Sequence, residues 1–177
     1  MPAEVLIAYC TRSGSTKEVA ESIGRTMNEA GLPADVKPMA DVQSVPQGAA
    51  VLLGTALYIG HFPKEFHGFV GRFRSELEKV RPWIFVLGPT EKERKNFAAA
   101  EEQARKELDK YPWLRPADMR VLGGKFDPEH LNLPFPMSLV MKLPVNLMKK
   151  LPASDIRDWE WIEQWSRAIA ETLTARR

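Results

Sequence analysis

A run of hydroxyl-bearing residues around one glycine is the part of this sequence best suited to chemistry. It lies between an apolar segment, residues 5–9, and a helical pattern that begins near Lys17. When a strand, a turn and a helix follow one another, the unpaired backbone N–H groups of the turn and the positive end of the helix point toward one place. They stabilise an anion there. Glycine allows close backbone approach, and hydroxyl groups donate to phosphate oxygens. The run therefore predicts a phosphate site. Its residues are Thr11, Arg12, Ser13, Gly14, Ser15 and Thr16.

The familiar phosphate-binding motifs with other spacings do not fit this run. The nucleotide-triphosphatase loop needs a second glycine followed by lysine, and neither is present. The dinucleotide loop needs three glycines, and only Gly14 is available. A phosphatase loop starting at Cys10 would need arginine where this chain has Thr16. Two interpretations remain for the pattern Thr-x-Ser-Gly-x-Thr: a phosphate loop of another kind, or a hydroxyl cap that begins a surface helix.

Length and composition predict one globular domain, residues 1–177. The chain is 44% hydrophobic and 27% charged, which is ordinary for such a domain, and its net charge of +2 is too small to indicate a nucleic-acid partner. The single cysteine, Cys10, excludes an internal disulfide framework and a cysteine zinc cluster, so we expect no metal. The N-terminal segment carries Glu4 where a signal peptide would need a basic residue, and the sequence has no apolar run of about 20 residues. We therefore expect a cytoplasmic protein without signal peptide or spanning helix.

Apolar strand patterns alternate with amphipathic helix patterns along the chain. The strands are expected at 5–9, 34–38, 50–54, 83–87 and 119–124, and the helices at 16–30, 64–80, 91–110 and 157–174. Strands that are apolar throughout are typical of a parallel sheet covered on both faces. The order therefore predicts an α/β protein with helices on both sides of a five-stranded parallel sheet.

Three loops are expected to meet at one edge of that sheet. In open parallel sheets, ligands bind beyond the carboxyl ends of the strands, where the strand order switches. The phosphate run follows the first strand, and two further loops follow the third and fourth strands. Their residues are Thr55, Ala56, Leu57, Tyr58, Ile59, Gly60, Gly88, Pro89 and Thr90. The convergence of these loops predicts a cofactor site.

A long insert, residues 127–156, separates the fifth strand from the last helix. Connections of this type usually have about 2–6 residues, and longer ones are commonly functional. Within the insert, residues 131–150 contain no acid, three methionines and a terminal Lys149-Lys150 pair. Methionine gives an adaptable apolar surface, and lysine is attracted to anionic lipid. We expect peripheral membrane contact here, with packing on the sheet edge or a homodimer interface as the open alternatives.

Taken together, these features resemble the flavodoxin-like proteins grouped with menaquinone-dependent protoporphyrinogen IX dehydrogenase. The resemblance covers nearly the whole chain and is carried by residues 11–16, 54–61, 123–127 and 155–159. It implies FMN as cofactor and a three-layer α/β/α sandwich with strand order 2-1-3-4-5. The protoporphyrinogen-oxidising members carry an Arg-Tyr pair before the glycine of the second loop, whereas this chain has Tyr58-Ile59 before Gly60.

The resemblance also implies roles for the three loops. Ser13 to Thr16 would hold the FMN phosphate, residues 55–60 would pass the isoalloxazine ring, and residues 88–90 would border its other side. Arg12 is expected either to pair with the phosphate or to be a solvated loop charge. Tyr58 is expected either to stack on the ring or to pack on the following helix, and His61 either to donate a proton or to lie outside the site. Cys10 is expected to be a buried apolar residue.

The predicted function is that of an FMN-dependent oxidoreductase. It would pass electrons from a reduced organic substrate, such as protoporphyrinogen IX, to a quinone, and no catalytic protein side chain is required because the flavin carries the redox chemistry. One alternative is a flavodoxin-type electron carrier that serves protein partners. Another is a phosphate-binding protein without flavin.

Overall fold

The computed structural model describes residues 5–127 and 152–175. Five of its strands form one parallel sheet in the order β2-β1-β3-β4-β5, as predicted. The sheet strands are β1 (Val5–Tyr9), β2 (Ala34–Pro38), β3 (Ala50–Ala56), β4 (Trp83–Leu87) and β5 (Asp118–Leu122). The helices are α1 (Ser15–Glu29), α2 (Lys64–Arg72), α3 (Arg74–Leu77), α4 (Arg94–Leu108) and α7 (Trp159–Thr174). The order of the strands places the point of reversal between β1 and β3.

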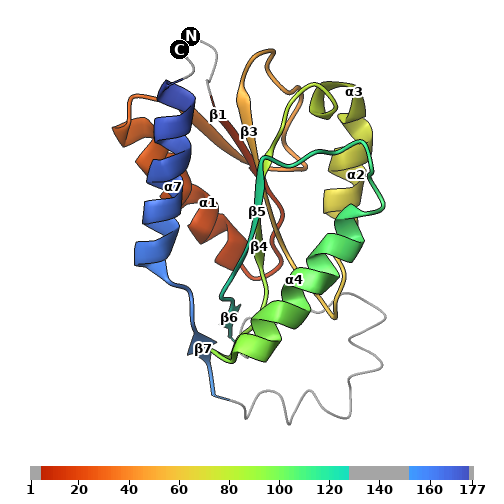
Figure 1. Ribbon diagram of the computed structural model, residues 1–177, viewed down its shortest axis with the longest axis vertical. Helices are drawn as coiled ribbons and strands as arrows, with labels where there is room; N and C mark the ends of the chain where they lie inside the picture. The colour runs from red at the N-terminus through yellow and green to blue at the C-terminus, as the bar shows by residue number, and fades with distance from the viewer. Residues whose placement is uncertain (1–4, 128–151, 176–177) are drawn as a thin grey trace.

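Helices cover both faces of the sheet, which gives the three layers (Figure 1). Alternate side chains of β1 serve the two faces: Val5 and Ile7 pack with α1 and α7, whereas Leu6 and Ala8 pack with α2 and α3. All four of these side chains are at most 1% exposed. A strand between two helical layers has no solvent face, which is why β1 is apolar at every position.

The helices differ from the predictions mainly at their ends. The predicted helix 64–80 is broken at Phe73 into α2 and α3, because Phe73 takes φ −105° and ψ 28°, outside the helical region. The predicted helix 91–110 begins only at Arg94, since Glu93 is extended. The predicted helix from Arg157 begins at Trp159, where the Asp158 side chain caps it by accepting from the Trp161 N–H.

Two strands also differ from the predictions. The strand β3 continues through Thr55 and Ala56, which were expected to lie in the second loop. The strand β5 ends at Leu122, and the chain then forms a short antiparallel ribbon that was not predicted, made of β6 (Lys125–Phe126) and β7 (Ser154–Asp155). The ribbon lies beyond the end of β5, close to the start of α4 (Figure 1).

The apolar segment 131–150, expected to meet a membrane, lies outside the described residues. Within residues 5–127 and 152–175, none of the helices combines the length and the hydropathy needed to cross a bilayer.

Candidate cofactor-binding site

The loop between β1 and α1 is folded around Gly14. Its backbone has φ +87°, in the left-handed region that glycine adopts without strain, and a Cβ at this position would meet no atom within 4 Å. The Gly14 N–H donates to Thr11 Oγ1 over 2.9 Å, and the Gly14 carbonyl accepts from the Glu18 N–H over 3.1 Å. The loop is therefore held in shape by its own groups and leaves open space in front of Gly14.

Thr16 carries a buried hydroxyl without a partner. The residue is 0% exposed, and within the described part of the chain its Oγ1 is the one buried side-chain oxygen or nitrogen that makes no hydrogen bond. An unpaired buried hydroxyl costs about 1–3 kcal/mol, so such groups usually have a ligand or water partner. Its position in the first turn of α1 fits a phosphate group, which accepts hydrogen bonds and is stabilised at a helix N-terminus.

The second loop lies against the first through Arg12 and Tyr58. The Tyr58 hydroxyl accepts from the Arg12 N–H over 3.2 Å, and the Arg12 guanidinium lies 4.1 Å from the centre of the Tyr58 ring. A cation over an aromatic face is attracted by the ring, typically by about 0.5–2 kcal/mol. Arg12 and Tyr58 therefore contact each other, and the roles expected for them toward a phosphate and a flavin ring stay predictions.

The ends of β1 and β3 meet at Cys10 and Thr55. The Cys10 Sγ–H donates to Thr55 Oγ1 over 3.3 Å, and the Cys10 N–H donates to the Gly54 carbonyl over 2.9 Å. Burial raises the pKa of the Cys10 thiol to about 11, so the thiol is protonated at neutral pH. The prediction that Cys10 is a buried apolar residue is confirmed, since it is 7% exposed.

The third loop is joined to both the second loop and the ribbon. The Leu57 N–H donates to the Leu87 carbonyl over 2.9 Å, just before Gly88, and the Gly124 N–H donates to the Pro89 carbonyl over 2.7 Å. Ser154 of β7 donates to the Thr90 carbonyl over 3.2 Å. The three predicted loops are therefore brought to one edge of the sheet, and the third is supported by Gly124, before the insert, and by Ser154, near the end of the insert.

The tip of the second loop is a tight turn with an exposed apolar residue. Tyr58 and His61 form a backbone bridge, with Ile59 at φ 52° and Gly60 at φ 79° between them. A β-branched residue with positive φ is strained, and strain of this kind is concentrated at functional sites. The Ile59 side chain is 74% exposed, so the turn presents it to solvent beside the predicted site.

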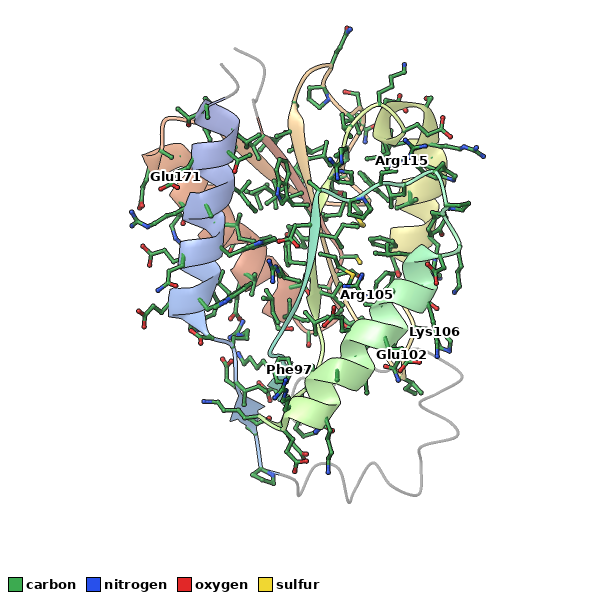
Figure 2. The ribbon with its side chains drawn as sticks, in the orientation of Figure 1. Phe97, Glu102, Arg105, Lys106, Arg115 and Glu171 are labelled. Carbon is green, nitrogen blue, oxygen red and sulfur yellow. The ribbon has the colours of Figure 1, made fainter. Side chains whose placement is uncertain are left out.

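Sequence analysis missed Glu107, which fastens this turn to α4. Glu107 is 3% exposed, and its carboxylate accepts from His61 Nδ1 over 3.0 Å and from the Phe62 N–H over 3.3 Å. It also lies 3.1 Å from His67 Nε2 and 2.6 Å from Lys110 Nζ. By contrast, Glu102 and Lys106 project from the outer side of α4 (Figure 2).

The sequence signal that could have found Glu107 is its helical spacing, and its hydrogen bonds explain why the buried carboxylate is charged. It follows the buried Ala100 and Ala104 at helical intervals, so an acid stands on the apolar stripe. Burial alone would raise the pKa of Glu107, but hydrogen bonds from Lys110, His61 and the Phe62 N–H lower it to about 2. Through this contact with Glu107, His61 is held against α4, although the His61 side chain is 75% exposed.

We expect the Glu107→Gln variant to be less stable than wild type at pH 7 by about 3 kcal/mol, because each unit of pKa shift corresponds to about 1.4 kcal/mol. The folded pKa of about 2 lies below the unfolded value. The contribution is therefore complete above about pH 5 and is lost as the pH falls toward 2. Urea unfolding at pH 7, 5 and 3 measures the difference, which should shrink at the lowest pH.

Glu102→Gln is the matched control on the same helix. Its ion pair with Lys106 has both side chains about two-thirds exposed, at 67% and 68%, so its removal should leave stability nearly unchanged. A difference between wild type and Glu107→Gln that stays constant from pH 7 to pH 3 would show that the charge of Glu107 is not the cause.

Two hollows lie near this edge of the sheet. One of about 300 Å³ is lined by Thr11, Arg12 and the start of α2. The other, of about 710 Å³, runs along β5 between Phe97 of α4 and Trp161 of α7. None of the predicted site residues lines the larger hollow, so it is separate from the three loops.

Comparison with known proteins agrees with this architecture. Residues 6–149 match the family model described as "Flavodoxin domain". The chain is 25% identical over 173 residues to "Protoporphyrinogen IX dehydrogenase (quinone)" from Escherichia coli (strain K12), and the match covers 94% of each chain.

Solved structures share the fold at low sequence identity. A variant of the flavodoxin from Pseudomonas aeruginosa aligns with a TM-score of 0.58 and 18% identity, over 96% of this chain and 98% of that one. A flavodoxin from the domain Archaea aligns with a TM-score of 0.55 and 13% identity, over 96% and 98% of the two chains. Since the family model matches most of the sequence, this protein belongs to the flavodoxin domain family.

Proposed function

We propose that this protein is an FMN-dependent oxidoreductase that passes electrons from a reduced organic substrate to a quinone. The observation that carries the proposal is the buried, unpartnered Thr16 hydroxyl in the first turn of α1, beside the open space at Gly14. The quinone acceptor is supported by the relative from Escherichia coli, whose name includes a quinone and whose similarity spans 94% of the chain.

The residues of the three loops have the chemistry that FMN needs. Thr16 Oγ1 and the amides of residues 13–16 would donate to the phosphate. The second loop, with Tyr58 beneath Arg12, and the third loop, from Gly88 to Thr90, would border the isoalloxazine ring. Thr11 and Arg12 would lie at the rim of the phosphate site.

When bound, FMN supplies reversible two-electron transfer, and the protein supplies binding, orientation and electrostatics. The organic substrate would lose two electrons and two protons, and the quinone would gain both to become a hydroquinone. No side chain of the chain has to act as a nucleophile. The neutral Cys10 thiol, buried against Thr55, is unsuited to that role. Backbone groups of residues 55–60 would orient the ring and shield it from water.

Protoporphyrinogen IX is the substrate suggested by the relative from Escherichia coli. Tyr58-Ile59 stands where the resemblance leads us to expect an Arg-Tyr pair, so other reduced organic substrates are included in the proposal. Any protein bound at this edge of the sheet, including a second copy of the chain, would have to leave the tip of the second loop accessible to that substrate.

Anaerobic mixing of the FMN-loaded protein with protoporphyrinogen IX and a menaquinone analogue tests the proposal. Continued turnover monitored by porphyrin fluorescence supports the oxidoreductase. Reduction of one equivalent of flavin without turnover, followed by oxidation by a redox protein, would instead favour an electron carrier. A protein that stays colourless after incubation with FMN would refute both.

We also propose, from sequence, that residues 131–150 attach the protein peripherally to anionic membranes. Each lysine near such a surface contributes about 1 kcal/mol. Replacing both Lys149 and Lys150 by glutamate should therefore lower binding to phosphatidylserine vesicles by more than tenfold in a sedimentation assay, while FMN affinity stays the same. Equal sedimentation of the two proteins would leave sheet packing or dimerisation as the role of this segment.

A further inference from the structure

A buried arginine links the segment after the insert to the first turn of α1. Arg157 lies between β7 and α7, and its side chain is 3% exposed. Its Nη1 donates to the Ser15 carbonyl over 3.3 Å and lies 2.7 Å from Glu18 Oε2. Ser15 and Glu18 flank Thr16, so the guanidinium lies against the helical turn that carries the unpartnered hydroxyl.

The same guanidinium is fixed from its other side by Asp155. Arg157 Nε and Nη2 donate to the two oxygens of the Asp155 carboxylate over 2.8 Å and 2.5 Å. This two-point contact is stronger and more directional than a single hydrogen bond. It lowers the pKa of Asp155, because hydrogen bonds from Arg157 favour the ionised carboxylate. Lys125 of β6 approaches Glu18 Oε1 at 3.7 Å.

Removing the arginine would change the electrostatics at the helix N-terminus. Glu18 and Asp155 carry two negative charges, and Arg157 and Lys125 carry two positive charges. The group is therefore neutral while Arg157 is present and would be negative without it. A negative charge in the first turn stabilises the helix itself, but it repels an anionic ligand at the same place. Glu18 needs a counter-charge for that turn to hold a phosphate group.

We propose that Arg157 is a positioning residue for the phosphate monoester of the cofactor, an inference that rests on the proposed FMN function. It acts through α1: it cancels the charge of Glu18 and holds the Ser15 peptide, so that the first turn presents Thr16 to a dianion. Its contacts also explain why the chain beyond the insert returns to the phosphate end of the site. The affinity for the cofactor would therefore depend on where Asp155 and Arg157, at the end of the insert, are held.

Flavin binding by fluorescence quenching tests this inference, with FMN compared against riboflavin, which lacks the phosphate. Arg157→Gln should weaken FMN binding about tenfold, since an uncompensated charge at this range is worth roughly a factor of ten. Its effect on riboflavin should be less than threefold. Glu18→Gln alone should tighten FMN binding by about threefold, because the network then has a net positive charge.

The double variant Glu18→Gln/Arg157→Gln separates charge compensation from simple structural support. If Arg157 acts by cancelling Glu18, the double variant should bind FMN within about threefold of wild type, because the loss from removing the positive charge and the gain from removing the negative charge then offset each other. Arg167→Gln is the matched control, because Arg167 pairs with Glu163 on the exposed side of α7 and should leave both flavin affinities unchanged.

The outcomes distinguish this inference from the proposed function. Equal losses of FMN and riboflavin affinity in Arg157→Gln, or a double variant as weak as the single one, would overturn the positioning role. If Arg157→Gln does not fold, Glu18→Gln decides: tighter FMN binding supports the role, and unchanged binding overturns it. Wild-type protein that binds neither flavin would refute the proposed function itself.

Discussion

Replacing Gly14 by alanine should weaken FMN binding by about 10- to 100-fold. Gly14 has φ +87°, and the left-handed conformation costs other residues about 1–2 kcal/mol, so the free loop would relax away from the binding shape. The new methyl group would also enter the open space where the phosphate is expected. Fluorescence titration of wild type and Gly14→Ala with FMN and riboflavin measures the effect, and the loss should be confined to FMN.

Gly31 provides the matched control at the other end of α1. It has φ +75°, and a Cβ there would also meet nothing within 4 Å. Gly31→Ala should therefore lower stability by a similar 1–2 kcal/mol without changing FMN affinity. If both variants bound FMN as wild type does, the phosphate would not lie against the loop that contains Gly14.

Replacing Gly54 by alanine should lower the free energy of unfolding by about 3 kcal/mol, near the upper end for overpacking of a core. Gly54 lies in β3, at the centre of the sheet, and a Cβ there would lie 2.2 Å from Phe85 Cζ. Phe85 is 0% exposed, so its ring lies in the close-packed core and can move only by displacing its neighbours. Urea unfolding at constant pH measures the loss.

Two comparisons identify the ring as the cause. Gly68→Ala places a methyl group in open space on α2, where alanine stabilises a helix by about 0.5–1 kcal/mol relative to glycine. The double variant Gly54→Ala/Phe85→Leu should recover part of the stability lost in Gly54→Ala, since the smaller side chain makes room. A Gly54→Ala protein as stable as wild type would show that the strand and the ring are farther apart than described.

The sheet could be predicted from the sequence because hydrophobic patterns are local. Val19, Ile23 and Met27 recur at helical spacing, and all three are 0% exposed in α1. Pro38 is typical of an edge strand, because proline cannot donate a hydrogen bond to a neighbouring strand, and β2 does lie at the edge of the sheet. Such patterns depend only on which face of a helix or strand is buried, so they can be recognised without knowing which element packs against that face.

Features that depend on distant partners could not be predicted in this way. The helical spacing places Glu107 on the apolar stripe of α4, but it does not show that groups on two other segments compensate the buried carboxylate. Arg157 was assigned to the start of a helix, whereas its hydrogen bond to the Ser15 carbonyl joins residues 142 positions apart in sequence. The residues of the three loops were predicted from motif and topology, and their contact with a cofactor stays a prediction.

A crystal structure of this protein with FMN is the most direct test of the account. We predict that the phosphate lies within hydrogen-bond distance of Thr16 Oγ1 and that the rings lie between Tyr58 and the loop from Gly88 to Thr90. A flavin bound elsewhere, such as in the hollow along β5, or a Thr16 hydroxyl that stays without a phosphate partner, would contradict it.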